Sequence, residues 1–131
     1  MPSAKKNERY LITVEARFEA AHHLRSYYGK PEPLHGHSWR VEAKIESRKL
    51  DREAISVDYV KVRKRLEGLA QKLDYGFINR IPPFDRLNPT SENIAKWFYE
   101  KLSEESLPIS ARLKEITLWE GPFHSLTYRT D

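Results

Sequence analysis

The sequence has 131 residues, of which 39% are hydrophobic and 32% are charged, a size and balance that suit one compact domain. It contains no cysteine, which excludes disulfides, thiolate metal ligands and a cysteine nucleophile, so any metal must be held by His, Asp or Glu. The net charge of +4 comes from Lys and Arg scattered among Asp and Glu, which argues against a nucleic-acid partner and is compatible with a small anionic substrate.

No apolar run approaches the ~20 residues that a membrane-spanning helix needs. Residues 1–8 form a polar tail without the apolar stretch of a signal peptide. We therefore expect a cytoplasmic protein with no membrane partner, made of this tail and a single domain over residues 9–131.

The first two predicted elements are strands. Over residues 10–20 apolar side chains occupy the even positions and mostly polar ones the odd positions, which is the period of a half-buried strand. Residues 38–46 alternate in the same way, with the apolar side chains at odd positions. We expect the two strands to pair as an antiparallel hairpin, with a long connection that carries Gly29, Pro31 and Pro33.

An amphipathic helix is predicted between residues 56 and 73. Its apolar residues recur at spacings of three and four, which places them on one side of a helix. Tyr59 is the first member of this apolar stripe, and Leu73 is the last. Ser56 or Asp58 can supply the N-cap.

A second helix and two short strands complete the chain. Thr90 and Ser91 follow three prolines and stand where an N-cap is expected, and the apolar pattern after them continues to Leu102. Two short apolar patterns over residues 116–118 and 126–128, divided by Gly-Pro, predict the terminal strands.

The predicted order is strand, strand, helix, helix, strand, strand (ββααββ). A four-stranded antiparallel sheet with both helices on one face satisfies this order, which makes the fold α+β. The outer strands of so small a sheet would be open edges that invite pairing with other copies. We therefore expect a homo-oligomer whose sheets join into a barrel.

Four of the five histidines fall within residues 22–37, around the predicted hairpin. His22 continues the even-numbered apolar face of the first strand, and His35 and His37 share the odd-numbered apolar face of the second, so all three can point inward together. Three imidazoles leave a fourth tetrahedral position open, which is the arrangement of catalytic zinc. From spacing alone, a zinc site and ordinary hairpin histidines are about equally favoured, and His23 has the wrong parity to take part.

Several segments resemble the family of 6-pyruvoyl tetrahydropterin synthase and 6-carboxy tetrahydropterin synthase. Phe18-Glu19-Ala20-Ala21-His22 and Leu34-His35-Gly36-His37-Ser38-Trp39 are similar to the zinc motif of that family. Residues 73–79, 88–93 and 118–120 resemble later family segments in the same order, so the resemblance spans residues 9–129. It implies the T-fold, a barrel formed by oligomerisation, typically of two stacked trimers, and pterin sites at the subunit interfaces.

The resemblance also implies roles for individual residues. It makes His22, His35 and His37 the zinc (Zn²⁺) ligands, Glu120 the carboxylate that anchors the pterin, Thr90 and Ser91 the loop beside it, and Asp74 the catalytic aspartate. A carboxylate is suited to this anchoring because it can accept two hydrogen bonds from the amino and ring N–H groups of a pterin. Without the resemblance, Glu120 would be read as a charged strand end, and Thr90 and Ser91 as helix caps.

Two catalytic positions depart from the family. The position of the usual general-base cysteine is Pro31, and the histidine that usually follows the catalytic aspartate is Tyr75. In some family members a glutamate replaces the cysteine and the side chain of the substrate is cleaved, so Glu32 is the candidate base; an exposed loop glutamate is the near-equal alternative. Tyr75 can donate a proton or only pack, and His124 is a further candidate for the lost histidine.

These observations predict a zinc-dependent pterin lyase that acts on 7,8-dihydroneopterin triphosphate or a dephosphorylated form. Elimination of triphosphate would give a 6-pyruvoyl or 6-carboxy product, whereas carbon–carbon cleavage would give 6-hydroxymethyl-dihydropterin, the outcome that Glu32 favours. A catalytically silent pterin-binding oligomer is the second hypothesis, because both usual proton-transfer residues are missing. A zinc hydrolase with another substrate is the third. The expected partners are a small-molecule pterin and further copies of the chain, as a trimer or hexamer.

Overall fold

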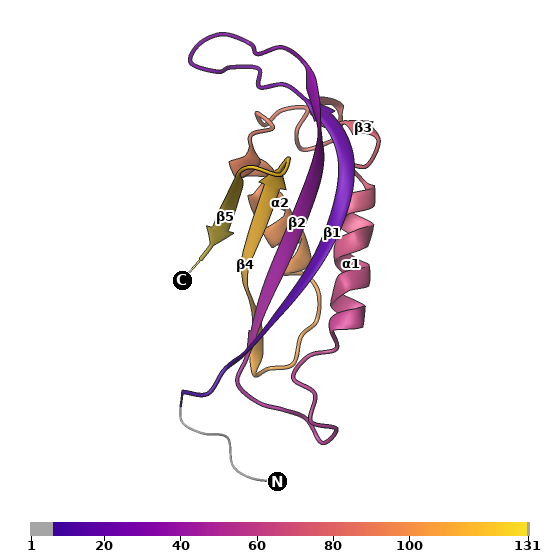
Figure 1. Cartoon of the computed structure of the whole chain (residues 1–131), viewed down its shortest axis with the longest axis vertical. Coiled ribbons are helices and arrows are strands. Elements are labelled where there is room, and N and C mark those ends of the chain that lie inside the picture. The colour runs from indigo at the N-terminus through magenta and orange to yellow at the C-terminus, as the bar shows by residue number, and fades with distance from the viewer. Residues whose placement is uncertain (1–6, 131) are drawn as a thin grey trace.

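The computed structural model describes residues 7–130 and shows a twisted, mainly antiparallel sheet with two helices on one face (Figure 1). The helix α1 contacts β1, and α2 contacts β4 and β5. The elements are β1 (Tyr10–His22), β2 (His35–Ser47), α1 (Tyr59–Gln71), β3 (Gly76–Phe77), the short 3-10 helix η1 (Ile78–Arg80), α2 (Ser91–Leu102), β4 (Ala111–Glu120) and β5 (Ser125–Arg129).

This arrangement confirms the predicted α+β fold and the ββααββ order, with one addition. The sheet order is β3-β1-β2-β4-β5, and the added β3 runs parallel to β1 beside Ala20 and Ala21 only. Two residues are too few to produce a recognisable alternation in a sequence. Within residues 7–130 no strand covers the rest of the outer edge of β1 or the outer edge of β5, so both remain available for pairing.

The pairing of β1 with β2 sets the end of the sheet where the histidines lie. Phe18 faces Trp39 across the two strands, and their rings stack with centroids 5.7 Å apart. The same register places His22 opposite His35, and Ala20 opposite His37. The indole N–H of Trp39 donates to the Ala20 carbonyl at 3.1 Å, which holds this end of the hairpin together.

The helix α1 begins as predicted with a cap at Asp58, whose side chain accepts hydrogen bonds from the backbone N–H groups of residues 60 and 61. Its buried side, which includes Leu66 and Leu69, faces the sheet core. Tyr59 was predicted to belong to this side, but this was wrong, because it occupies the first helical position and its side chain is 60% exposed. Val57, which precedes the cap, is buried there instead.

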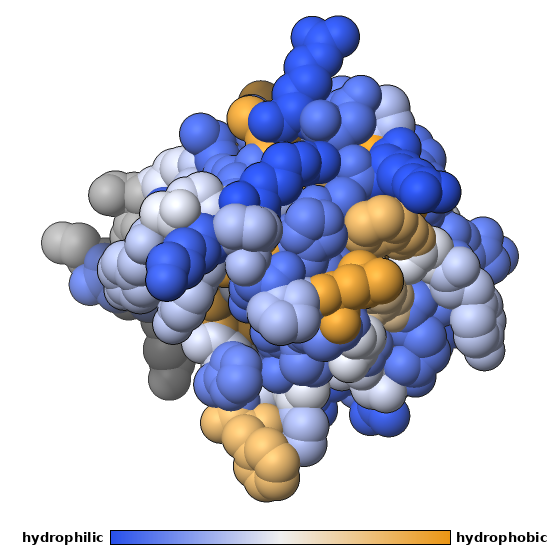
Figure 2. Space-filling model, turned by 90° about the horizontal axis from the view of Figure 1, so that it is seen from above, coloured by the Kyte–Doolittle hydropathy of each residue, from blue (hydrophilic) through white to orange (hydrophobic). Residues whose placement is uncertain are grey.

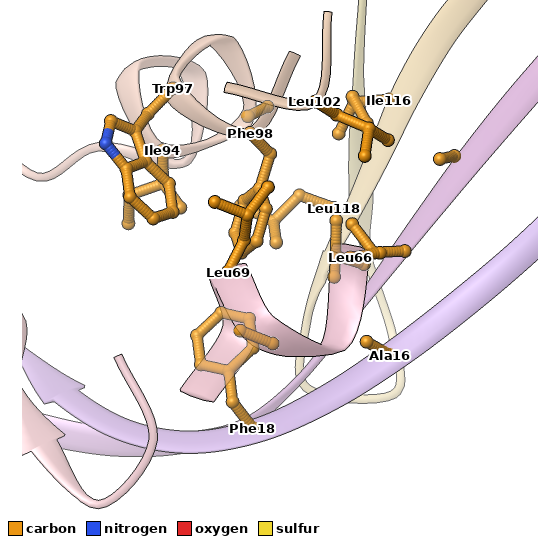
Figure 3. Packing of buried hydrophobic residues seen from close by; sticks show 14 of the residues in the cluster. Ala16, Phe18, Leu66, Leu69, Ile94, Trp97, Phe98, Leu102, Ile116 and Leu118 are labelled. Atoms are coloured by element: carbon orange, nitrogen blue, oxygen red, sulfur yellow. The ribbon is translucent and has the colours of Figure 1, made fainter. Parts of the chain in front are cut away.

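The helix α2 is capped by Thr90, whose hydroxyl accepts a hydrogen bond from the Asn93 N–H. Ile94, Phe98 and Leu102 turn inward as predicted. Figure 3 shows Phe98 and Leu69 among the side chains that fill the space between the two helices and the sheet. Burying side chains of this size contributes about 1.5–3 kcal/mol each, so the core holds the ends of β1, β2 and β4 in a fixed relation.

The connection between β1 and β2 projects beyond the end of the sheet (Figure 1). Tyr27 and Lys30 pair across its tip through two backbone hydrogen bonds of 2.6 and 3.3 Å. From above, at this end, the surface is mostly hydrophilic with a few apolar side chains between polar ones (Figure 2). Among the described residues, no helix has the length and apolarity needed to cross a membrane. The predicted tail of residues 1–8 lies outside the described residues, apart from its last two positions.

Candidate metal centre

Three histidines and one glutamate converge at one end of the sheet. His22 is the last residue of β1, His35 and His37 begin β2, and Glu120 is the last residue of β4, opposite Trp39. One possible ligand atom from each of the four side chains lies within 4.8 Å of all the others. The inward parity predicted for the three histidines therefore does bring their rings together.

Backbone carbonyls orient two of the three imidazole rings. The Nδ1 atom of His22 lies 2.8 Å from the Pro89 carbonyl oxygen, and the Nδ1 atom of His35 lies 2.9 Å from the Pro33 carbonyl oxygen. A carbonyl can only accept, so each Nδ1 atom must carry the proton in this contact. In the neutral form, each ring then presents the lone pair of Nε2 to the cluster, as metal-binding histidines do.

The cluster leaves two buried nitrogen atoms without hydrogen-bond partners, namely the Nε2 atoms of His22 and His37. Glu120 approaches both, with its Oε1 atom 3.0 Å from His37 Nε2 and its Oε2 atom 3.8 Å from His22 Nε2. With the proton of His22 on Nδ1, its Nε2 lone pair has nothing to accept from beside a carboxylate, and such unsatisfied buried groups are costly. A divalent cation among them would satisfy all of these atoms, so the residues fit a metal with nitrogen and oxygen ligands.

The carboxylate of Glu120 is anionic at neutral pH. Its contact with the His22 ring lowers its pKa to about 2, against the opposing effect of burial and with help from the Ser91 hydroxyl. Burial alone would lower the pKa of His22, but contacts with Glu120 and the Pro89 carbonyl outweigh it and raise the pKa. Burial lowers the pKa of His37, although the charge of Glu120 opposes this.

The N-terminus of α2 supports Glu120. The Ser91 hydroxyl donates to Glu120 Oε2 at 2.9 Å, so the predicted association of these two residues is present. Thr90, predicted to lie beside the pterin, uses its hydroxyl to cap α2. A helix N-terminus also favours a nearby negative charge.

Glu32 lies at the edge of the histidine cluster. Its Oε1 atom accepts a hydrogen bond from the Leu24 N–H at 2.9 Å and lies 3.8 Å from the Nε2 atom of His35. The backbone N–H of Glu32 also donates to the Leu24 carbonyl, at 3.0 Å. This glutamate is therefore held in place beside the candidate metal site and is not a free loop side chain.

The structure leaves Asp74 and Tyr75 outside the histidine cluster. The Oδ1 atom of Asp74 accepts a hydrogen bond from the Glu19 N–H at 2.8 Å. Tyr75 is 88% exposed and lines a cavity of about 460 Å³ that His37 also lines. His124 is exposed on the turn after β4, near enough for its charge to lower the pKa of His37.

The sequence carried no signal for the contacts that orient the rings. The Pro89 carbonyl is a backbone group 67 residues from His22, and its role depends on how the segment before α2 packs. Asn79 is buried and binds the backbone of His23 through both ends of its amide, at 3.0 and 2.9 Å. The ring of His23 lies near Phe77 and is not part of the metal-binding group.

Comparison with known proteins places these features in a family. The model of the family described as 6-pyruvoyl tetrahydropterin synthase matches residues 11–131. The dihydroneopterin monophosphate aldolase of Pyrococcus furiosus is 34% identical over 110 residues, which cover 84% of this chain and 89% of that protein. The 6-carboxy-5,6,7,8-tetrahydropterin synthase of Synechocystis is 34% identical over 104 residues, which cover 76% of this chain and 79% of that protein. The solved structure of the 6-pyruvoyl tetrahydropterin synthase of Caenorhabditis elegans has the same fold, with a TM-score of 0.79 and 22% identity. The match covers 95% of this chain and 97% of that one.

Proposed function

The chain belongs to the 6-pyruvoyl tetrahydropterin synthase family, and from this premise we propose that it is a zinc-dependent lyase that cleaves the side chain of a phosphorylated 7,8-dihydroneopterin. The main support for a bound metal is that the buried Nε2 atoms of His22 and His37 have no hydrogen-bond partner. The observation that favours carbon–carbon cleavage is the placement of Glu32 beside His35, where it can replace the missing cysteine. The 34% sequence identity to the dihydroneopterin monophosphate aldolase of Pyrococcus furiosus also supports carbon–carbon cleavage.

His22, His35 and His37 would hold the zinc through their Nε2 atoms, and the carbonyls of Pro89 and Pro33 keep two of the rings in the required tautomer. When bound, zinc acts as a Lewis acid that polarises oxygen atoms of the substrate and leaves a coordination position for them. Side chains of the protein would bind the pterin ring and transfer the proton.

Glu120 would anchor the pterin ring. Its carboxylate, with a pKa of about 2, is ionised at neutral pH and can accept two hydrogen bonds from the amino and ring N–H groups. The Ser91 hydroxyl orients one oxygen of this carboxylate. The six-position side chain of the substrate would then extend toward the histidine cluster, where Glu32 lies.

Glu32 would act as the general base. It takes the proton from the hydroxyl on the second carbon of the substrate side chain, and the bond between the first and second carbons breaks. The second carbon becomes an aldehyde that leaves with the phosphorylated fragment. The first carbon takes the proton back from Glu32, which regenerates the base, and becomes the hydroxymethyl group of 6-hydroxymethyl-dihydropterin. Holding the carboxylate through the Leu24 N–H keeps it oriented for the first of these steps.

A catalytically silent pterin-binding oligomer is the second candidate, favoured by the position of Asp74, which binds the Glu19 N–H away from the cluster. Incubation of the zinc-loaded protein with 7,8-dihydroneopterin, its monophosphate and its triphosphate, followed by chromatography, separates the candidates. We expect 6-hydroxymethyl-dihydropterin and an aldehyde fragment. A 6-pyruvoyl or 6-carboxy product would indicate elimination, binding without turnover would indicate the silent oligomer, and no pterin binding would refute the substrate class.

The open edges of β1 and β5 support the oligomer. We propose that these edges pair between copies so that the sheets close into a barrel of a trimer or hexamer. Sedimentation equilibrium of the zinc-loaded protein tests this proposal, because a mass that stays at 15.5 kDa over a wide concentration range would contradict it.

A further inference from the structure

The orientation of His22 depends on a segment far away in the sequence. The Nδ1 atom of His22 makes a buried contact of 2.8 Å with the carbonyl of Pro89, just before α2. The segment of residues 79–89 that leads to this carbonyl contains three prolines, which have no N–H group to donate. Phe84 and Arg86 close local turns within the segment, through backbone hydrogen bonds to the carbonyls of Ile81 and Pro83. Contacts from outside the segment are needed to fix these turns, and with them the Pro89 carbonyl, relative to β1.

Arg25 supplies these contacts. Its Nη2 atom donates to the carbonyls of Asn79 at 2.9 Å and Phe84 at 2.6 Å, and its Nη1 atom donates to the Leu87 carbonyl at 2.9 Å. The backbone N–H of Arg25 donates to the side chain of Asn88 at 2.8 Å. One planar guanidinium therefore ties together three points of the segment, which a lysine ammonium cannot match in geometry.

Two asparagines of the segment bind back to the chain around Arg25. Asn79 accepts from the His23 N–H and donates to the His23 carbonyl, and Asn88 donates to the Ser26 carbonyl at 3.1 Å. Residues 23–26 and the segment of residues 79–88 are thus joined through both side chains and backbone. His22 and Pro89 directly adjoin the two joined stretches, so this network constrains their mutual distance, together with the Asn93 amide, which donates to the Asn88 carbonyl at 2.9 Å.

We propose that Arg25 is a positioning residue of the metal centre, which acts by holding the Pro89 carbonyl where it fixes the ring and tautomer of His22. Arg25 would not touch the metal, because a guanidinium is a permanent cation with no acceptor atom. The inference rests on the metal-binding part of the proposed function, and it does not depend on which pterin is the substrate. Partners that orient a ligand in this way typically contribute about 10–100-fold to metal affinity.

Cobalt(II) is a suitable probe, because it takes nitrogen and oxygen ligands as zinc does and its visible absorption reports ligand geometry. The full-length metal-free protein is titrated with cobalt alone as wild type, Arg25→Ala, Arg25→Lys and Arg86→Ala, the last being an exposed arginine of the same segment. We expect about a 10-fold weaker affinity and altered absorption bands for Arg25→Ala, a partial loss for Arg25→Lys, and no change for Arg86→Ala.

The thermal midpoint of each metal-free variant is measured in parallel to separate positioning from general stability. An Arg25→Ala protein that melts at a lower temperature but binds cobalt with wild-type affinity and spectrum would overturn the proposal, because Arg25 would then only stabilise the fold. If Arg25→Ala does not fold, Arg25→Lys decides in the same way. Wild-type protein that binds no cobalt would refute the metal centre itself, a result distinguishable from failure of the Arg25 inference alone.

Discussion

The Oε1 atom of Glu120 lies 3.0 Å from the Nε2 atom of His37, where the end of β4 meets the start of β2. Ser91 holds the other oxygen of the same carboxylate, at 2.9 Å. Glu120 is therefore fixed between the candidate metal ligands and the N-terminus of α2. From this position it could be a fourth metal ligand or the anchor of a pterin ring, and these roles predict different results when it is replaced.

We predict that Glu120→Ala loses pterin binding and keeps stoichiometric zinc. Hydrogen bonds to a charged group contribute about 1.5–3 kcal/mol, so the affinity for a dihydroneopterin should fall by about 10–100-fold. Calorimetric titration with the pterin and metal analysis of the same preparation measure the two properties. Glu115→Ala, on the same strand, is the control and should change neither. Loss of zinc with unchanged pterin affinity would instead make Glu120 a metal ligand.

We predict that His22→Ala abolishes the stabilisation of the protein by zinc. A bound ligand stabilises the folded state by RT ln(1 + [L]/Kd), which is about 2.7 kcal/mol when the free metal is 100 times the dissociation constant. Wild-type protein should therefore melt at a higher temperature with zinc than with a chelator, and His22→Ala should not. The adjacent His23→Ala should behave as wild type, because His23 lies outside the metal-binding group. Equal zinc responses in the two variants would exclude His22 as a ligand.

The sheet and the convergence of the histidines could be predicted because the alternation of a strand has a period of two that its backbone imposes. Once the apolar faces of β1 and β2 were assigned, the inward direction of His22, His35 and His37 followed from parity alone. A local pattern also placed the cap of α2 at Thr90 or Ser91, since a hydroxyl before an apolar helical pattern has a local role, and the cap is Thr90.

The contacts that orient the site could not be predicted in this way. His22 contacts the Pro89 carbonyl, and Arg25 donates to the Asn79 carbonyl, 54 residues away. Every residue has a backbone carbonyl, so the sequence does not indicate which carbonyl will accept such a bond. The exposure of Tyr59 was also missed, because helical spacing identifies a side of a helix but not where the helix stops packing on the sheet. Such features depend on tertiary packing and not on a local pattern.

The contrast between Leu66 and Tyr59 can be measured. Leu66 is fully buried under the sheet, and Tyr59 is 60% exposed at the start of the same helix. We predict that Leu66→Ala lowers the free energy of unfolding by about 2–5 kcal/mol, because the lost side chain leaves a cavity. Tyr59→Ala should change it by about 0.5 kcal/mol or less. Urea denaturation of the metal-free variants at one protein concentration gives both values, and similar losses would contradict the assignment of the core.

The sharpest prediction concerns Glu32, whose carboxylate has both a structural and a proposed chemical role. Glu32→Gln keeps an oxygen that can accept from the Leu24 N–H but removes the group that can take a proton. We therefore expect the fold, the zinc content and the KM to stay near wild type, while kcat falls by about 10²–10⁴-fold. Steady-state kinetics with dihydroneopterin monophosphate, alongside metal analysis, measure these quantities.

Glu92→Gln provides the matched control, because Glu92 is an exposed glutamate in the first turn of α2, away from the Leu24 contact. It should keep full activity. If Glu32→Gln were as active as this control, the base would have to be another group, and Tyr75, which lines the same cavity as His37, would be the next to replace. The amide keeps the contact with the Leu24 N–H, so loss of zinc in Glu32→Gln could not come from a displaced loop. A fall in activity together with loss of zinc would therefore mean that the charge of Glu32 supports the metal site, and would contradict its role as the base.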